Sequence, residues 1–258
     1  MATVAAMTAA AGLVSAVPAQ AAQVIRVRCP TDNLQTAIDS APPGSTLLVF
    51  GTCTGNFTIS KNLTLIGYGA TLDGNNSGPV VTVTPGVQAQ LTTLTITHGR
   101  GPGVGFGGGG IQNLFGTVTL DHSTVVDNTA PVEDGGGASS GGFGGGIANT
   151  AGTVTLHHST VRDNTAQNSG GGIATGGGGT MVLDHSTVSG NSSQEGGGIF
   201  NDGDTVTLNG SAVHHNSATF DGGGIYNSAG TVTLVRSIVR NNTPNNCAPP
   251  GSVPGCTS

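Results

Sequence analysis

Two carboxylates have a spacing that could support catalysis. Glu195 and Asp221 each precede a run of three glycines and lie 26 residues apart. If 26 residues make one structural repeat, the two side chains occupy equivalent positions in adjacent repeats, about 5 Å apart, as in the carboxylate pair of a retaining glycosidase. Acidic residues are also common in solvated turns, and the sequence shows no burial of either one. Glu195 and Asp221 are therefore weak catalytic candidates.

Two aromatic residues accompany these carboxylates. Phe200 and Tyr226 follow the isoleucines that end two successive Gly-Gly-Gly-Ile segments. We expect both rings to point outward and to stack between repeats, where they would suit the face of a sugar. The alternative is that they merely cover a corner, since isolated exposed apolar side chains are common.

Two insertions, 98–107 and 131–143, enter just before Gly-Gly-Gly-Ile segments. Insertions on one side of a repeat protein often mark its binding face. Glu133 and Asp134 lie in the second insertion. Together with Phe200 and Tyr226 they complete the predicted ligand-binding set.

His122, His158 and His185 form a column, each preceding a serine in successive repeats. Three imidazoles in line could bind a metal, but zinc requires a tetrahedral ligand set that a linear column supplies poorly. We expect exposed turn histidines, with no metal and no other cofactor.

Outward threonines form a Thr-x-Thr array similar to those of β-helical ice-binding proteins. Threonine is also an ordinary residue of solvated strands, and Thr180-Met181-Val182 interrupts the pattern. The array contains Thr117/Thr119, Thr153/Thr155, Thr205/Thr207 and Thr231/Thr233.

Apart from the two insertions, these positions belong to one recurring unit of the form GGGI, TVTL, Ser-x-Val and Asn. The unit's isoleucines are separated by 36, 26, 26 and 26 residues, which indicates a repeat architecture. TVTL alternates with period two, so Val and Leu should face inward and Thr outward. Such short strands can pair only with their copies in neighbouring units, which predicts a parallel β-helix of about eight coils. The recurring residues are Ile111, Ile147, Ile173, Ile199 and Ile225, with Asn128, Asn164, Asn191, Asn216 and Asn242.

We expect the five recurring asparagines to form an internal asparagine ladder that satisfies buried polar groups. We expect the glycines to occupy corners that need a positive φ.

The two ends of the chain differ from the repeats. Residues 1–21 lack charge and end in Ala-Gln-Ala, which predicts a secretory signal peptide, although the usual basic residue is missing; a short buried helix is the alternative. Residues 22–45 should form a cap with a helix over 31–40, N-capped by Thr31 or Asp32. The β-helix should span 46–246, with early strands at 46–50, 57–60, 63–66, 80–84 and 91–97.

Four cysteines lie in two pairs near the ends of the chain. In an exported protein this predicts the disulfides Cys29–Cys53 and Cys247–Cys256, the second closing a tail at 247–258. A structural zinc site needs closer cysteine spacing.

Composition excludes several partners. The chain has 46 glycines, 8% charged residues and a net charge of −6, which argues against nucleic acid and against anionic membranes. The leader is too short to span a bilayer, and no other stretch is a transmembrane candidate.

The segment LQTAIDSAPPGSTLLVFGTCTGNFTISKNLTLIGYGATLDG resembles the opening of right-handed parallel β-helix proteins of the pectin-lyase-like superfamily. The GGGI…TVTL…STV…N units are similar to bacterial polymorphic outer-membrane-type repeats. The resemblance covers nearly all of 29–246 and implies the fold. The acidic motifs of glycosidase and lyase members are missing from the sequence.

We therefore expect a secreted or surface-associated monomer that binds carbohydrate or another surface without catalysis. A polysaccharide lyase or glycoside hydrolase is the first alternative, and an ice-binding protein is the second.

Overall fold

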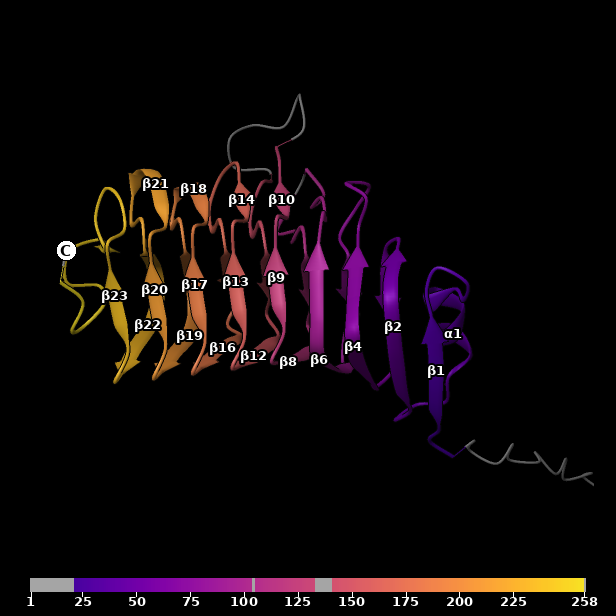
Figure 1. Ribbon diagram of the computed structural model, residues 1–258. Coiled ribbons are helices and arrows are strands. Elements are labelled where there is room, and N and C mark those ends of the chain that lie inside the picture. Colours follow the sequence, from indigo (N-terminus) through magenta and orange to yellow (C-terminus); the bar gives the residue numbers. More distant parts are fainter. Residues whose placement is uncertain (1–20, 104, 133–140, 258) are drawn as a thin grey trace, which may run out of the picture.

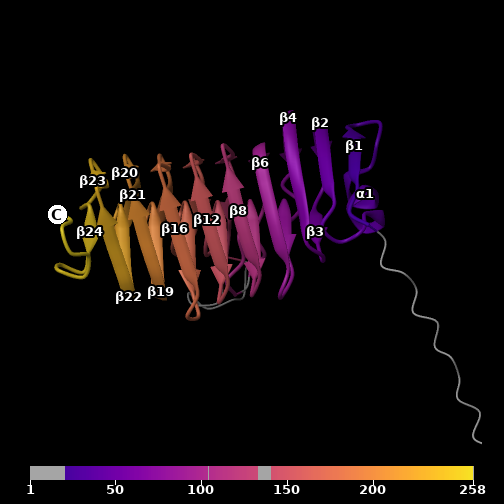
Figure 2. The same ribbon diagram turned by 90° about the horizontal axis from the view of Figure 1, so that it is seen from below.

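The strands stack as successive coils along a rod in the computed structural model, which describes residues 21–103, 105–132 and 141–257 (Figures 1 and 2). All pairings between strands are parallel, and about eight turns make up the solenoid. The fold is an all-β, right-handed parallel β-helix, as the sequence predicted. Each coil contributes strands to three columns, and each column runs the length of the rod.

The first column contains the TVTL strands and their counterparts in the early coils. Its members are β1 (Val24–Arg28), β2 (Thr46–Thr54), β4 (Leu63–Asp73), β6 (Gln88–Thr97), β8 (Thr117–Asp121), β12 (Thr153–His157), β16 (Thr180–Asp184), β19 (Ile199–Asn209) and β22 (Ile225–Val235).

The second column continues the ends of β2, β4 and β6. It contains β9 (Thr124–Val126), β13 (Thr160–Arg162), β17 (Thr187–Ser189), β20 (Ala212–His214) and β23 (Ile238–Arg240).

The third column includes the first residues of β19 and β22. Its other members are β3 (Phe57–Ile59), β5 (Val81–Val83), β7 (Ile111–Leu114), β11 (Ile147–Thr150), β15 (Ile173–Gly176) and β24 (Cys247–Ala248).

A smaller sheet lies along the upper edge in Figure 1. It contains β10 (Thr129–Ala130), β14 (Thr165–Ala166), β18 (Ser192–Glu195) and β21 (Ser217–Asp221).

The core is a stack of identical apolar positions. Val154 pairs in register with Met181, which pairs with Val206, and all three are fully buried. The threonines between them keep part of their surface in solvent, so the predicted alternation is confirmed. Burying each such side chain stabilises the fold by about 1.5–3 kcal/mol.

The predicted asparagine ladder is also present. Asn164 Nδ2 donates to Asn191 Oδ1 at 3.0 Å, and Asn191 Nδ2 donates to Asn216 Oδ1 at 2.9 Å. The same amides donate to backbone carbonyls, and every ladder member retains at most 8% exposure. The ladder therefore satisfies backbone groups at a turn that is sealed from water.

The three glycines at 196–198 have different roles, and the expected positive φ holds only for the first of them. At Gly196 φ is +62°, a conformation that favours glycine. Gly197 and Gly198 have ordinary φ values but face backbone of the neighbouring coil. A Cβ on Gly197 would lie 2.3 Å from the Ser217 carbonyl oxygen, and one on Gly198 would lie 2.6 Å from that of Gly224.

A helix covers the first coil, as predicted, but its start was placed wrongly. The helix α1 spans Leu34–Ser40, and Asn33 is the N-cap, with Oδ1 accepting from the Thr36 backbone N–H at 2.9 Å. Asp32 instead accepts from the backbone N–H of Arg28. Residues 1–20 of the predicted leader at 1–21 lie outside the described residues. Over the described part of the chain, no helix is long and apolar enough to cross a membrane.

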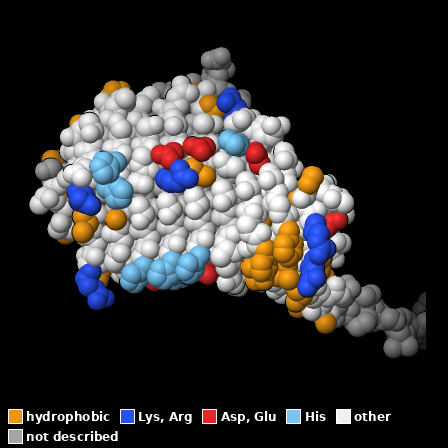
Figure 3. Space-filling model, in the orientation of Figure 1, with side chains coloured by type: hydrophobic (Ala, Val, Ile, Leu, Met, Phe, Trp, Pro, Cys, Tyr) orange, Lys and Arg blue, Asp and Glu red, His pale blue; other side chains and the backbone are white. Residues whose placement is uncertain are grey.

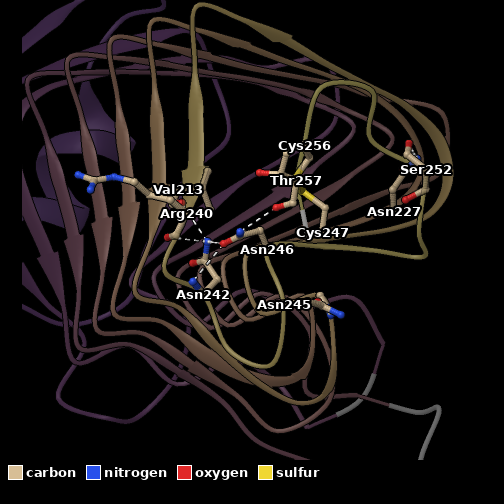
Figure 4. The surroundings of a disulfide bond; sticks show 11 residues. Val213, Asn227, Arg240, Asn242, Asn245, Asn246, Cys247, Ser252, Cys256 and Thr257 are labelled. Carbon is tan, nitrogen blue, oxygen red and sulfur yellow. Dashed lines mark hydrogen bonds between the residues drawn. A yellow bond between two sulfur atoms is a disulfide. The ribbon is translucent and has the colours of Figure 1, made fainter.

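Both predicted disulfides are present, Cys29–Cys53 and Cys247–Cys256. The second fixes a tail that caps the asparagine ladder and also a second asparagine column, in which Asn201 Nδ2 donates to Asn227 Oδ1 (Figure 4). Asn246 Oδ1 accepts from Asn242 Nδ2 at 3.1 Å, in place of the asparagine that a further coil would supply. The Ser252 carbonyl accepts from Asn227 Nδ2 at 3.0 Å in the same way.

Candidate functional site

The small sheet on the upper edge brings the two candidate carboxylates together. Glu195 ends β18 and pairs with Asp221 at the end of β21, so they are neighbours on adjacent coils as predicted. Asp221 Oδ1 accepts from Asn245 Nδ2 at 2.5 Å and from the Gly222 backbone N–H at 3.0 Å. Both carboxylates are half-buried, and those hydrogen bonds orient Asp221.

The two predicted aromatics lie beside the carboxylates. Phe200 and Tyr226 pair in register, and their rings stack with centroids 5.8 Å apart and planes 14° apart. The stacking expectation is confirmed. Phe200, however, retains only 7% exposure, so most of its ring is covered, and Tyr226 presents more of its surface.

Two further aromatic rings extend this stack, and the sequence reasoning missed both. Phe106 and Phe143 come from the two insertions and stack with centroids 4.5 Å apart. Phe143 lies 6.2 Å from Phe200. The result is a continuous row of four rings, which we call the aromatic platform: Phe106, Phe143, Phe200 and Tyr226.

The register explains why the insertions supply these rings. The column position of Phe200 and Tyr226 is occupied by Ala148 and Ala174 in the two preceding coils, and both alanines are fully buried. Phe106 lies against this region, because its Cζ is 3.3 Å from where a Cβ on Gly176 would project. We infer that the small side chains leave space that the inserted rings fill. In the sequence, the available signal for these two rings was the pair of alanines, Ala148 and Ala174, beside insertions that contain phenylalanine.

A hollow of about 520 Å³ opens over the platform. It combines apolar ring faces with polar groups that can hydrogen-bond a ligand, a composition typical of ligand sites. Its lining residues are Gly105, Phe106, Phe143, Asn168, Ser169, Glu195, Phe200 and Asp202.

The charges at the site affect the pKa of Tyr226. Burial, followed by the negative charges of Glu195 and Asp221, raises the pKa of the Tyr226 hydroxyl above its ordinary value. The phenol therefore stays protonated across the physiological range and remains able to donate a hydrogen bond.

The other two predicted ligand-binding residues, Glu133 and Asp134, lie outside the described residues. Within the described ranges, no group of three or more His, Cys, Asp or Glu side chains could hold a metal ion. The described residues of this site offer ring faces for stacking, hydrogen-bonding groups and a pair of carboxylates.

The threonine array is more regular than the sequence suggested. Thr180 pairs in register with Thr153 and Thr205, so the first threonine of each pair is uninterrupted there. Only Val182 replaces the second threonine, between Thr155 and Thr207.

No protein-family model matches the chain, and no curated protein sequence matches it. Among solved structures, the chain is similar to an alginate lyase from Paenibacillus sp. str. FPU-7, with 13% identity, a TM-score of 0.45, and coverage of 87% of this chain and 97% of the lyase. It is similar to the pectate lyase Pel9A, with 10% identity, a TM-score of 0.45, and coverage of 93% and 82%. It is also similar to a pectin methylesterase from Aspergillus niger, with 14% identity, a TM-score of 0.39, and coverage of 86% of each chain. The assignment of the fold stands on the strand pairing described above.

Proposed function

We propose that this protein is an exported β-helix that binds a polysaccharide along the aromatic platform without cleaving it. The observation that carries the proposal is the row of four neighbouring rings beside Glu195 and Asp221, in which two stacked pairs meet at a tilted contact between Phe143 and Phe200. Aromatic faces bind the apolar faces of sugar rings, and carboxylates accept hydrogen bonds from sugar hydroxyls. The row crosses successive coils, so a linear polymer lying along the rod would meet several rings.

The shape and the ends of the molecule support the same proposal. The hollow is open, which suits a polymer that extends past the site. Two disulfides fit an oxidising compartment outside the cytosol. The platform lies on one chain, so binding requires no second copy.

Removal of two platform rings should reduce glycan binding. We expect the double variant Phe143→Ala and Tyr226→Ala to bind its polysaccharide at least about tenfold more weakly, because each stacked ring contributes about 0.5–1.5 kcal/mol beyond its buried area. The measurement is affinity electrophoresis across a polysaccharide panel, followed by titration of any ligand that binds. We leave Phe200 unchanged because it is nearly buried, and its removal would also reduce stability.

Phe115→Ala is the matched control, since Phe115 is 57% exposed and lies outside the platform. It should leave binding unchanged. If the double variant kept wild-type affinity for every ligand on the panel, the platform would not be the binding site.

Catalysis is the first alternative, and the observation that favours it is the register pairing of Glu195 with Asp221. Carboxylates about 5 Å apart suit a retaining glycosidase. A screen for reducing ends and unsaturated products on the same panel tests this. If the wild type turns over a polysaccharide and Glu195→Gln and Asp221→Asn abolish that turnover, the function is hydrolysis or elimination rather than binding.

Ice binding is the second alternative, favoured by the in-register threonines of β8, β12, β16, β19 and β22. Thermal hysteresis in the wild type that disappears on Thr207→Tyr would establish it.

A further inference from the structure

The edge where β9, β13 and β17 begin carries a row of histidines, visible along the lower edge of Figure 3. The His122 and His158 rings stack with centroids 4.9 Å apart, and the His158 and His185 rings with centroids 5.3 Å apart. We call this edge the histidine stripe. It also includes the neighbouring register column of Asp121, His157 and Asp184.

The two carboxylates of the stripe orient three of its four imidazoles. Asp121 Oδ1 lies 2.8 Å from His122 Nδ1, and Asp184 Oδ1 lies 3.0 Å from His185 Nδ1. The second oxygen of Asp184 lies 3.2 Å from His157 Nδ1. The contacts occupy Nδ1, so Nε2 is the nitrogen left for an external partner. These three histidine side chains are 42–62% exposed.

Burial, the largest single contribution, raises the pKa of Asp184, but the hydrogen bonds and charges of His157 and His185 together lower it below its ordinary value. Asp184 therefore remains ionised in mildly acidic solution.

The row of rings stops at Gly210, where a side chain is missing. A Cβ at this position would lie 3.1 Å from His185 Nε2, and the next side chain in the column is Arg236. A hollow of about 380 Å³ lies where a side chain at position 210 would be. It is lined by Asp184, His185, Asn209, Gly210 and Arg236.

We propose that the histidine stripe binds a linear polyanion in mildly acidic conditions, with one anionic group of the polymer seated between His185 and Arg236. Imidazole side chains ordinarily gain a proton as the pH falls from about 7.5 to about 5.5. The charged or titratable groups along this edge are Asp121, His122, His157, His158, Asp184, His185 and Arg236.

The charge of the stripe therefore reverses with pH. Two carboxylates and one guanidinium leave it with one net negative charge when the imidazoles are neutral, and full protonation gives it three net positive charges. The imidazoles recur once per coil, a spacing of about 4.8 Å, so they present a line of charge to a polymer with repeated carboxylate, sulfate or phosphate groups. This surface is separate from the aromatic platform, and the inference does not depend on the proposed function.

The test compares binding of alginate, heparin and polyphosphate at about pH 5.5 and about pH 7.5 at one ionic strength, because such binding depends on salt. We expect at least one polymer to bind at least about tenfold more tightly at the lower pH. The three probes identify which anionic group fits best. The triple variant His122→Gln, His158→Gln and His185→Gln should reduce the ratio between the two pH values to less than about threefold.

The matched control removes three histidines from other positions, with His98→Gln, His214→Gln and His215→Gln, and it should keep the wild-type ratio. Gly210→Asn tests the seat directly, since asparagine tolerates the positive φ of this position and its side chain would fill the hollow. It should weaken binding at the lower pH about fivefold or more. The proposal is overturned if no polymer binds more tightly at the lower pH, or if the triple variant keeps the wild-type ratio.

Discussion

Replacement of Asn191 by leucine is expected to lower the free energy of unfolding by about 3 kcal/mol or more, because each buried group left without a partner costs about 1–3 kcal/mol. Asn191 Oδ1 accepts from both the backbone N–H and Nδ2 of Asn164, each at 3.0 Å. Its Nδ2 donates to the Val161 and Ser189 carbonyls and to Asn216 Oδ1. Leucine can replace none of these contacts, and Asn191 is only 1% exposed.

For a domain of this size, such a loss lowers the melting temperature by about 2–4 °C per kcal/mol, or about 6–12 °C in total. Thermal and denaturant unfolding provide the measurement. Asn209→Leu is the matched control, since Asn209 ends β19 next to the buried Leu208 and keeps part of its surface in solvent. It should change stability by no more than about 0.5 kcal/mol. Equal melting temperatures for Asn191→Leu and wild type would show that the ladder does not contribute to stability.

Gly197→Ala is expected to be at least as damaging, although it adds a single methyl group. The new Cβ would lie 2.3 Å from the Ser217 carbonyl oxygen and 2.6 Å from that of Gly223. Both atoms belong to the backbone of the next coil, so the clash can be relieved only by separating two coils. We expect a loss above about 3 kcal/mol, beyond the usual range for overpacking because no side chain can move aside.

Gly203→Ala is the comparison that separates clash from backbone strain. Gly203 has φ +96° but nothing within 4 Å of its Cβ position. Its replacement should cost about 1–2 kcal/mol from conformation alone. If Gly197→Ala unfolded at the same denaturant concentration as wild type, the coils would be less closely packed than described.

The fold was predictable because the same requirement recurs in every coil. A position such as Val188 must face the core between Val161 and Val213, so its apolar character repeats at the coil period. The asparagine ladder was predictable for the same reason, since each amide needs an equivalent neighbour. Cysteine pairing followed from positions near opposite ends of the rod.

The aromatic platform was only half predictable. Phe200 and Tyr226 occupy a repeat position, whereas Phe106 and Phe143 lie in insertions whose path no periodicity describes. The glycine triplets were misread in part, because close approach between coils depends on backbone atoms of a different repeat.

The burial of the Asp204 carboxylate was also not predictable from the repeat pattern. Thr175 lies in register between Asn149 and Asn201, so it replaces asparagine in the second asparagine column. The buried Asp204 supplies a hydrogen-bond acceptor there. Its Oδ1 accepts from the backbone N–H groups of Gly178 and Gly179, at 2.8 and 2.7 Å, and its Oδ2 accepts from the Thr175 hydroxyl. The residues involved belong to different coils, and a single substitution carries no periodic signal.

The in-register pairing of Ile173, Ile199 and Ile225 has a consequence for how such a chain evolves. Most positions in a coil face the same residue type above and below, so duplication or deletion of one complete unit by unequal recombination would preserve the isoleucine stack and the asparagine ladder. The helix at one end and the disulfide-fixed tail at the other stay in place. Rod length can therefore change in whole-coil steps, and the valency of any surface repeated along the rod changes with it, without redesign of the core.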